Sequence, residues 1–398
     1  MGAGVLFATK VSRRKFRRRR RECDIILSMK TKNPFFIKGY HGPEYFCDRV
    51  VETKKILSAI ENGRDITLMA PRRYGKTGLI HNVFSKLGRG YVPVYLDIFQ
   101  ISNLTEFTKV FSSRVVSALA TPLEKTGKGL LDFFRCCRPT ATPQLDGRVE
   151  FSFNIVPSDA EATLKDTFDF LESRKVEPVV AIDEFQQVRE FPEKGVEAML
   201  RSHVQFCGKS HFIFAGSKKH MMDEMFALPR GPFYQSTQLM NIDVIDRVKF
   251  SEFAERLFLR SGRRYDRDAF AYLYDRFNGV TWYLQVVLNR AWEWDSGLDS
   301  RGTVDEIVEQ LVDEGESTYS DLLLSQTQSS QSVLRAIAAE GVVREISAKS
   351  LIDKYRLPVG STIRSLAREL VNRNLVYKSA EGYSIYDQLF AEWLRDKI

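Results

Sequence analysis

The stretch "ITLMAPRRYGKTGLIHNVFSKLG", residues 66–88, decides the fold expected of this 398-residue chain. Its apolar start predicts a short buried strand, and residues 78–88 carry apolar side chains at helical spacing up to Gly88. The loop between them nearly matches G-x-x-x-x-G-K-[ST], with Ala70 in place of the first glycine. Backbone amides between a strand and the positive end of a helix favour an anion, so we expect a phosphate site here.

Three residues of this loop have specific expected roles. Gly75 lets backbone donors wrap the phosphates, Lys76 reaches the outer phosphates, and the Thr77 hydroxyl binds Mg²⁺. Ala70 fits the first position if its φ is negative. The alternative is an ordinary turn that happens to carry a lysine. The residues expected to contact nucleotide are Ala70, Pro71, Arg72, Arg73, Tyr74, Gly75, Lys76, Thr77 and Gly78.

Two further polar groups follow predicted strands. "VVAIDEF", residues 179–185, places Asp183 to hold the Mg²⁺ shell and Glu184 to polarise an attacking water. "IFAGS", residues 213–217, ends on Ser217, which either senses the γ-phosphate or is a turn residue. ATP and Mg²⁺ are therefore the expected ligands. ATP is expected rather than GTP because no guanine-reading Asn-Lys-x-Asp stretch occurs.

The order of predicted elements defines the fold class. Strands near 65–70, 91–99, 178–183 and 211–216 alternate with helices, and a hairpin is expected to turn at Asp146-Gly147. This alternation predicts an α/β fold with a mainly parallel sheet covered on both faces. From residue 246 only helices are expected, and the last 70 or so residues show three short helices and two strand-like pieces, the order of a winged helix. The expected divisions are 29–245, 246–325 and 326–398.

The basic charge is concentrated at the N-terminus. Residues 1–28 hold nine basic and two acidic residues, so the net charge of +8 leaves about +1 for residues 29–398. "RRKFRRRRR" fits a nucleic-acid arm, a localisation patch, a disordered extension, or sequence upstream of a true start at Met29. The five cysteines form no CxxC pair, and we expect no secretory signal and no membrane span. The cytoplasm is the expected compartment.

Five segments together resemble a known family, in chain order over about residues 33–398. They are "FCDR" (46–49), "APRRYGKTG" (70–78), "VVAIDEFQQV" (179–188), "FIFAGSKKHMMDEMF" (212–226) and "YSIYDQLFAEWL" (383–394). The chain is similar to the archaeal-type ATPase family, within the STAND branch of the AAA+-related P-loop ATPases.

The resemblance implies an architecture and a set of roles. It implies a P-loop ATPase core with a strand inserted between the P-loop and Asp183 strands, a helical lid, and a C-terminal winged helix. By the same resemblance Asp183 is the Mg²⁺ partner, Glu184 the catalytic base and Ser217 the sensor. Arg49 is expected near the base side of the nucleotide.

Two departures from the family pattern concern turnover more than binding. "PFYQS" has Gln235 and Ser236 where relatives often carry Gly-Arg, and "NGVTWYL" lacks the proline that usually follows the lid glycine. Arg72 and Arg73 are either a substitute positive charge in cis or exposed loop arginines.

Two functions follow from these observations. The leading hypothesis is a Mg²⁺-dependent ATPase that acts as a switch, in which ATP closes the lid and hydrolysis releases the lid and the winged helix. The rival is a DNA- or protein-binding adaptor that holds ATP structurally. The helix "STIRSLARELVNR", 361–373, with Lys378 on the wing, is expected to present these residues to DNA or to a protein partner: Ser361, Thr362, Arg364, Ser365 and Arg368. An oligomer is compatible with the sequence.

Overall fold

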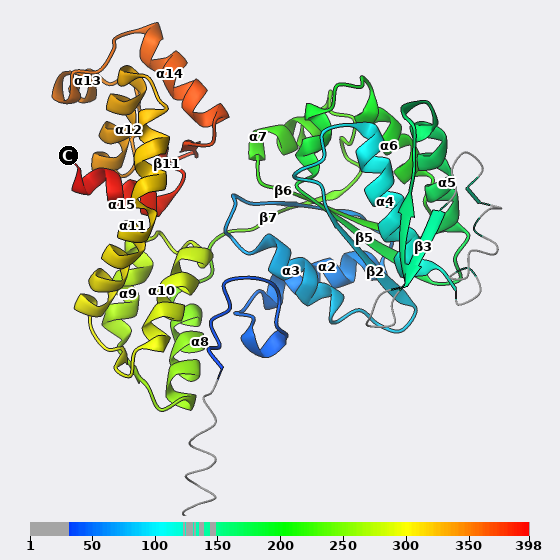
Figure 1. The fold of residues 1–398 in the computed structure, drawn as a ribbon, viewed down its shortest axis with the longest axis horizontal. Helices are drawn as coiled ribbons and strands as arrows, with labels where there is room; N and C mark the ends of the chain where they lie inside the picture. The colour runs from blue at the N-terminus through cyan, green and yellow to red at the C-terminus, as the bar shows by residue number, and fades with distance from the viewer. Residues whose placement is uncertain are drawn as a thin grey trace, which may run out of the picture.

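The computed structural model describes residues 32–121, 124, 130, 133–134, 139–143 and 149–397. Figure 1 shows an α/β core beside a second lobe, in which a group of helices lies below a C-terminal domain. The basic tail of residues 1–28 and the expected turn at Asp146-Gly147 lie outside the described residues.

A five-stranded parallel sheet forms the core, in the order β2-β5-β6-β1-β7. Its strands are β1 (Ile66–Met69), β2 (Tyr91–Asp97), β5 (Glu177–Asp183), β6 (His211–Gly216) and β7 (Gln238–Asn241). β6 lies between β1 and β5, which confirms the expected inserted strand. Sequence analysis did not predict β7, which pairs along the whole of β1.

Helices cover both faces of this sheet because successive strand residues point to opposite sides. On β5, Val179 and Ala181 belong to the core with α2 (Val50–Glu61) and α3 (Lys76–Phe84). Val180 and Ile182 belong to the core on the other face, formed with α4 (Leu104–Leu119), α5 (Ala160–Glu172) and α6 (Val196–Gln205). The prediction of an α/β fold with both faces covered is confirmed.

The remaining elements of the core are short. β3 (Pro139–Pro143) and β4 (Val149–Phe153) form an antiparallel pair beside α4. Helical turns are η1 (Pro43–Tyr45), η4 (Pro157–Asp159), η5 (Phe185–Glu190), α7 (Lys219–Met222) and η6 (Asp223–Ala227).

A helical lid follows the sheet, formed by α8 (Arg247–Arg260), α9 (Arg267–Arg276) and α10 (Thr281–Glu293). The expectation of helices without strands is wrong at one point, because β8 (Arg264–Tyr265) pairs with β9 (Gly297–Leu298). Gly297 permits this pairing: its φ is +71°, and a Cβ there would lie 2.3 Å from the carbonyl oxygen of Arg264.

α11 (Arg301–Leu324) links the lid to the C-terminal domain, packing on α9 and α10 and on α15 (Gln388–Asp396). That domain contains α12 (Gln328–Glu340), α13 (Lys349–Tyr355), α14 (Ser361–Asn372), β10 (Val376–Lys378) and β11 (Tyr383–Ile385). Three helices and an antiparallel hairpin confirm the expected winged helix. Lid and winged helix share one hydrophobic core.

The segment that precedes α2 packs on the lid as well as on the core that α2 and α3 form with the sheet. Phe35 is fully buried against Phe253 and Phe258. Its neighbour Asn33 donates a 2.9 Å hydrogen bond to the carbonyl oxygen of Asn289, and the Asn289 amide donates to the carbonyl oxygen of Phe35 at 2.7 Å. The N-terminal segment therefore joins α2 to α10.

No helix among the described residues is long and apolar enough to span a membrane.

Candidate nucleotide site

The loop between β1 and α3 has the backbone of a phosphate site. Gly75 precedes α3 with φ +87°, and Arg73 also has a positive φ of +72°. Ala70 is not among the described non-glycine residues with positive φ. It therefore meets the condition under which an alanine fits the first position of the loop. Lys76 is 6% exposed and donates to the carbonyl oxygen of Ala70 at 3.1 Å. Burial lowers the pKa of Lys76, and the carboxylates of Glu184 and Asp183 oppose that shift.

The carboxyl ends of β2 and β5 gather oxygen groups next to α3. The Thr77 hydroxyl donates to Asp183 Oδ2 at 2.7 Å, and the Tyr95 hydroxyl donates to the same oxygen at 3.0 Å. Asp97 is the register partner of Asp183 on the neighbouring strand. A hydroxyl and carboxylates suit a hard cation such as Mg²⁺, which prefers oxygen ligands. These side chains therefore fit the expected Mg²⁺ at Thr77 and Asp183.

Glu184 is held by two neighbouring side chains. Its backbone is in the left-handed region, with φ +57°. The Ser217 hydroxyl and the Gln186 amide both donate to Glu184 Oε2 at 2.5 Å. Ser217 therefore contacts Glu184 across the ends of β5 and β6, while Oε1 carries neither of these bonds. The roles of base and sensor stay predictions.

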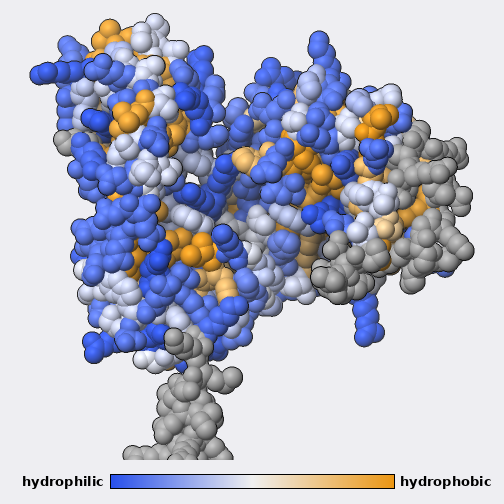
Figure 2. Space-filling model, viewed as in Figure 1, coloured by the Kyte–Doolittle hydropathy of each residue, from blue (hydrophilic) through white to orange (hydrophobic). Residues whose placement is uncertain are grey.

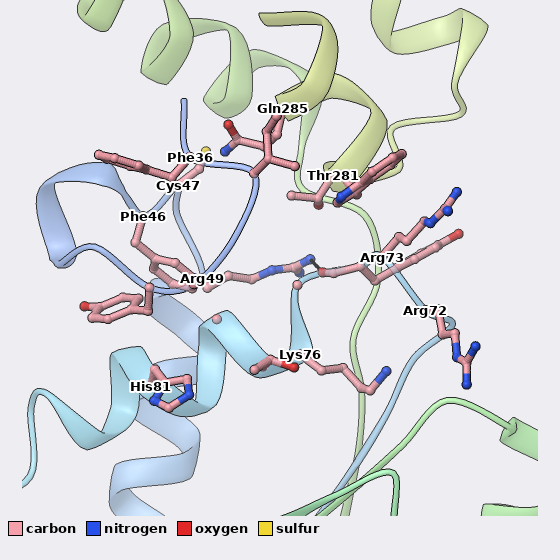
Figure 3. Close-up of a pocket in the computed structure, with 18 of the residues that line it drawn as sticks. Phe36, Phe46, Cys47, Arg49, Arg72, Arg73, Lys76, His81, Thr281 and Gln285 are labelled. Atoms are coloured by element: carbon pink, nitrogen blue, oxygen red, sulfur yellow. Dashed lines mark hydrogen bonds between the residues drawn. The ribbon is translucent and has the colours of Figure 1, made fainter. Parts of the chain in front are cut away.

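A cavity of about 490 Å³ opens between the loop, the segment before α2, and the lid (Figure 3). This volume lies within the range of ligand pockets. It is lined by Arg72 to Gly78, which form the end of the loop and the first turn of α3, and by Glu184. Ala70 and Pro71 line a second cavity of about 1000 Å³ between the loop, the lid and the winged helix. Figure 2 shows the hollow between the two lobes, bordered mostly by hydrophilic residues.

Arg49 lines the first cavity but is already bonded to protein groups. It is 4% exposed and donates to the carbonyl oxygens of Tyr74 at 3.3 Å and Asp243 at 2.5 Å. Its other nitrogen bonds Glu52 at 2.9 Å. Arg49 thus ties α2 to the loop and to the connection that follows β7. Its expected place near the nucleotide base stays a prediction.

The two loop arginines contact the second lobe. The backbone N–H of Arg72 donates to the Tyr386 hydroxyl at 3.2 Å, and its guanidinium stacks on Phe99. The Arg73 guanidinium lies 3.1 Å from Asp387, at the start of α15. It also donates to the Tyr283 hydroxyl and lies over the Trp282 ring at 4.2 Å. The backbone N–H of Trp282 in turn donates to the carbonyl oxygen of Arg73 at 3.2 Å. These arginines are engaged within the chain rather than exposed.

Sequence reasoning missed several of these groups. Tyr95 contacts Asp183 only because β2 lies beside β5, which a single sequence does not reveal. Gln186 is only two residues from Glu184, in η5, and no sequence pattern marks it as a partner of that carboxylate. Asp387 carried a usable signal, since it caps α15 by accepting from the N–H groups of Leu389 and Phe390. Its contact with Arg73 nevertheless spans more than 300 residues and had no local signal.

The described residues give few signs of other chemistry. Within the described ranges, no group of three or more His, Cys, Asp or Glu side chains could hold a metal ion. Of the cysteines, Cys47 and Cys207 are described and both are free. Burial raises the pKa of Cys47 to about 12.

Comparisons with solved structures support the architecture. A Walker-type ATPase of Pyrococcus abyssi aligns with a TM-score of 0.62 and 18% identity, covering 91% of this chain and 99% of that chain. The ORC2 protein of Aeropyrum pernix, in ADPNP and ADP complexes, aligns with a TM-score of 0.58 and 18% identity, covering 92% and 96%. The ORC1 protein of Aeropyrum pernix in complex with DNA aligns with a TM-score of 0.52 and 13% identity, covering 92% and 96%. No curated protein matches the sequence.

A parallel sheet of this order, a Gly-Lys-Thr loop before α3 and an acidic pair at the end of β5 define a P-loop ATPase. The family model described as "ATPase domain predominantly from Archaea" matches residues 46–287, and the chain belongs to that family. A second model, "Probable winged helix domain", matches residues 317–396. The chain is therefore an ATP-binding ATPase with a C-terminal winged helix, as its sequence predicted.

Proposed function

We propose that this ATPase is a Mg²⁺-dependent molecular switch in which the state of the nucleotide controls the position of the winged helix. The observation that carries the proposal is the double contact of Arg72 and Arg73 with Tyr386 and Asp387. These arginines lie in the short loop that leads into Lys76, the first residue of α3. Phosphates that reorganise the loop therefore act directly on groups that hold the second lobe.

Hydrolysis in this proposal uses the side chains that surround Glu184. A carboxylate oxygen of Glu184 takes a proton from water while the water oxygen bonds to the γ-phosphorus. The bond between that phosphorus and the bridging oxygen breaks, and ADP leaves with the electron pair. Lys76 stabilises the negative charge on the outer phosphates. Ser217 and Gln186, through their 2.5 Å hydrogen bonds, orient the Glu184 carboxylate.

Thr77 and Asp183 are the residues that would hold Mg²⁺. The ion would neutralise charge on the β- and γ-phosphates. The Thr77 hydroxyl donates to Asp183 Oδ2 at 2.7 Å, so the two side chains meet at one point.

ATP hydrolysis tests this proposal under single-turnover and steady-state conditions, with and without Mg²⁺. We expect the parent to hydrolyse ATP only with Mg²⁺, Lys76→Ala to lose ATP binding, and Glu184→Gln to bind without hydrolysis. If the parent binds ATP but hydrolyses it no faster than both variants, the rival adaptor function replaces the switch. The Gln235-Ser236 sequence, which lacks the usual Gly-Arg, is the feature that favours that rival.

DNA is the partner we propose for the winged helix. Arg364 and Arg368 are exposed on α14, and Lys378 is exposed on β10. Glu369 pairs with Arg373, just past the end of α14, at 3.6 Å, which leaves the two arginines of α14 to face a partner. The ORC1 protein, similar in fold, was solved in complex with DNA.

Salt-dependent DNA binding tests this partner. We expect the affinity of the parent to fall with rising salt, and the Arg364→Ala, Arg368→Ala double variant to bind more weakly with a shallower salt dependence. A parent without affinity for DNA would leave a protein as the partner. The domain divisions at 245/246 and 325/326, the STAND branch and the cytoplasmic compartment stay sequence-based predictions.

A further inference from the structure

The end of the first cavity that faces the lid carries two polar atoms without partners. Thr281 Oγ1 and Gln285 Oε1 are buried atoms that find no hydrogen-bond partner among the described residues. Both side chains line the cavity, one turn apart at the start of α10. Figure 3 shows them across the cavity from α3, which carries Lys76.

Other polar side chains that line this part of the cavity are already bonded. The Tyr40 hydroxyl donates to Asn82 Oδ1 at 3.0 Å. The His41 ring bonds the carbonyl oxygen of Lys38 at 2.9 Å. Arg49 bonds Glu52 and two backbone oxygens. Thr281 and Gln285 therefore have hydrogen-bonding capacity left for a ligand.

The surroundings of these two atoms suit a flat, apolar ring. Phe36, Phe46, Ile245 and Trp282 line the same cavity. The Phe46 ring also packs on the loop side, 3.2 Å from where a Cβ on Gly78 would lie. An aromatic ring with polar edges would fill this space and give the two buried oxygens partners.

We propose that Gln285 and Thr281 read the base of the nucleotide and select adenine. The Gln285 carbonyl oxygen accepts a hydrogen bond from the exocyclic amino group of adenine, and the Thr281 hydroxyl bonds a ring nitrogen of the same base. Guanine and hypoxanthine place a carbonyl oxygen where adenine has its amino group, so two acceptors would face each other in the amide orientation that Gln285 has in the structure. This inference rests on the ATP site of the proposed function.

Equilibrium binding of three triphosphates tests the proposal: ATP, GTP, and purine riboside triphosphate, which lacks the amino group. We expect the parent to bind ATP about tenfold or more tightly than either analogue, because an unpaired buried acceptor is costly. In Gln285→Leu, which keeps the side-chain size, the ratio of the two dissociation constants for ATP and purine riboside triphosphate is expected to approach one.

The control is Gln326→Leu, since Gln326 Oε1 is also buried without a partner but lies at the end of α11, outside this cavity. It should keep the parent's ratio, and thermal melting shows whether each variant is folded. A parent that binds all three triphosphates equally, or a Gln285→Leu variant with an unchanged ratio, overturns the base-reading role. If Lys76→Ala loses affinity for all three triphosphates while Gln285→Leu keeps the parent's ratio, the proposed ATP site stands and only the base-reading role fails. The two proposals can therefore fail separately.

Discussion

The Arg73 guanidinium lies 3.1 Å from the Asp387 carboxylate, and this ion pair joins the phosphate loop to the first turn of α15. The Tyr283 hydroxyl donates to the same carboxylate at 3.1 Å and accepts from the N–H of Gln388 at 2.8 Å. Core, lid and winged helix thus meet around one carboxylate. Any movement of the loop changes this meeting point.

Removing the charge of Asp387 should loosen the winged helix. In Asp387→Asn the side chain still caps α15 but no longer pairs with Arg73. Both partners are 32% exposed, so we expect a cost of about 1 kcal/mol, seen as roughly fivefold faster hydrogen exchange in residues 383–397. Asp246→Asn is the matched control, because Asp246 caps α8 in the same way and should leave this exchange unchanged. Equal exchange in Asp387→Asn and the parent would contradict the coupling.

The Ser217 hydroxyl is expected to matter for hydrolysis more than for binding. Ser217→Ala removes the hydrogen bond to the Glu184 carboxylate, and a hydrogen bond to such a group is worth about 1.5 to 3 kcal/mol. We therefore predict a fall in kcat of about 10-fold to 100-fold with little change in the dissociation constant of ATP. Ser217→Thr keeps the hydroxyl and should restore part of the rate. A parent-like kcat in Ser217→Ala would remove Ser217 from the mechanism.

A side chain at Gly216 is expected to crowd the buried side chains of Met222 and Gln186. A Cβ there would lie 2.4 Å from Met222 Sδ and 2.6 Å from Gln186 Oε1. Gly216→Ala should therefore lower the free energy of unfolding by about 1 to 3 kcal/mol and disturb the hydrogen bonds of Glu184. Gly88→Ala, whose Cβ would meet nothing closer than 4.0 Å, is the control. Chemical denaturation of both variants measures the free energy of unfolding, and a parent-like value for Gly216→Ala would contradict the prediction.

Asp65 gives the fold a specific pH dependence. Burial raises the pKa of Asp65 from 3.8 to about 6, although its carboxylate accepts from the N–H of Phe212 at 2.8 Å. Because the folded state binds this proton more tightly than the unfolded chain, the contribution of Asp65 to stability falls as pH rises from about 4 to about 6. Asp65→Asn should be more stable than the parent at pH 7, by at most about 3 kcal/mol, and nearly equal to it at pH 4. Denaturation at the two pH values measures this difference in the free energy of unfolding. A difference that is the same at pH 4 and pH 7 would contradict the prediction.

Local sequence signals predicted much of the fold. The apolar run before Ala70 and the Gly-Lys-Thr that follows predicted β1, the loop and α3, because each signal acts within a few residues. The strand at Asp183 and the three helices before the C-terminal hairpin were predicted for the same reason. β7 was missed because four residues with a mixed burial pattern give no clear periodicity.

The contacts of the site depended on topology and were largely beyond the sequence. Placing Ser217 against Glu184 requires β6 beside β5, which only the family resemblance implied. The sequence left two alternatives for Arg72 and Arg73, a charge in cis or exposed loop residues. The structure shows a third arrangement, in which both contact the winged helix.

Energy transfer between the core and the winged helix tests the switch most directly. The dyes would be placed at exposed positions through Arg89→Cys and Val359→Cys, with the native cysteines replaced by alanine and Glu184→Gln to preserve ATP. We predict high transfer efficiency with ATP and Mg²⁺, where the winged helix stays on the phosphate loop, and a clearly lower efficiency with ADP. Equal efficiencies in the two states, with both nucleotides shown to be bound, would contradict the switch.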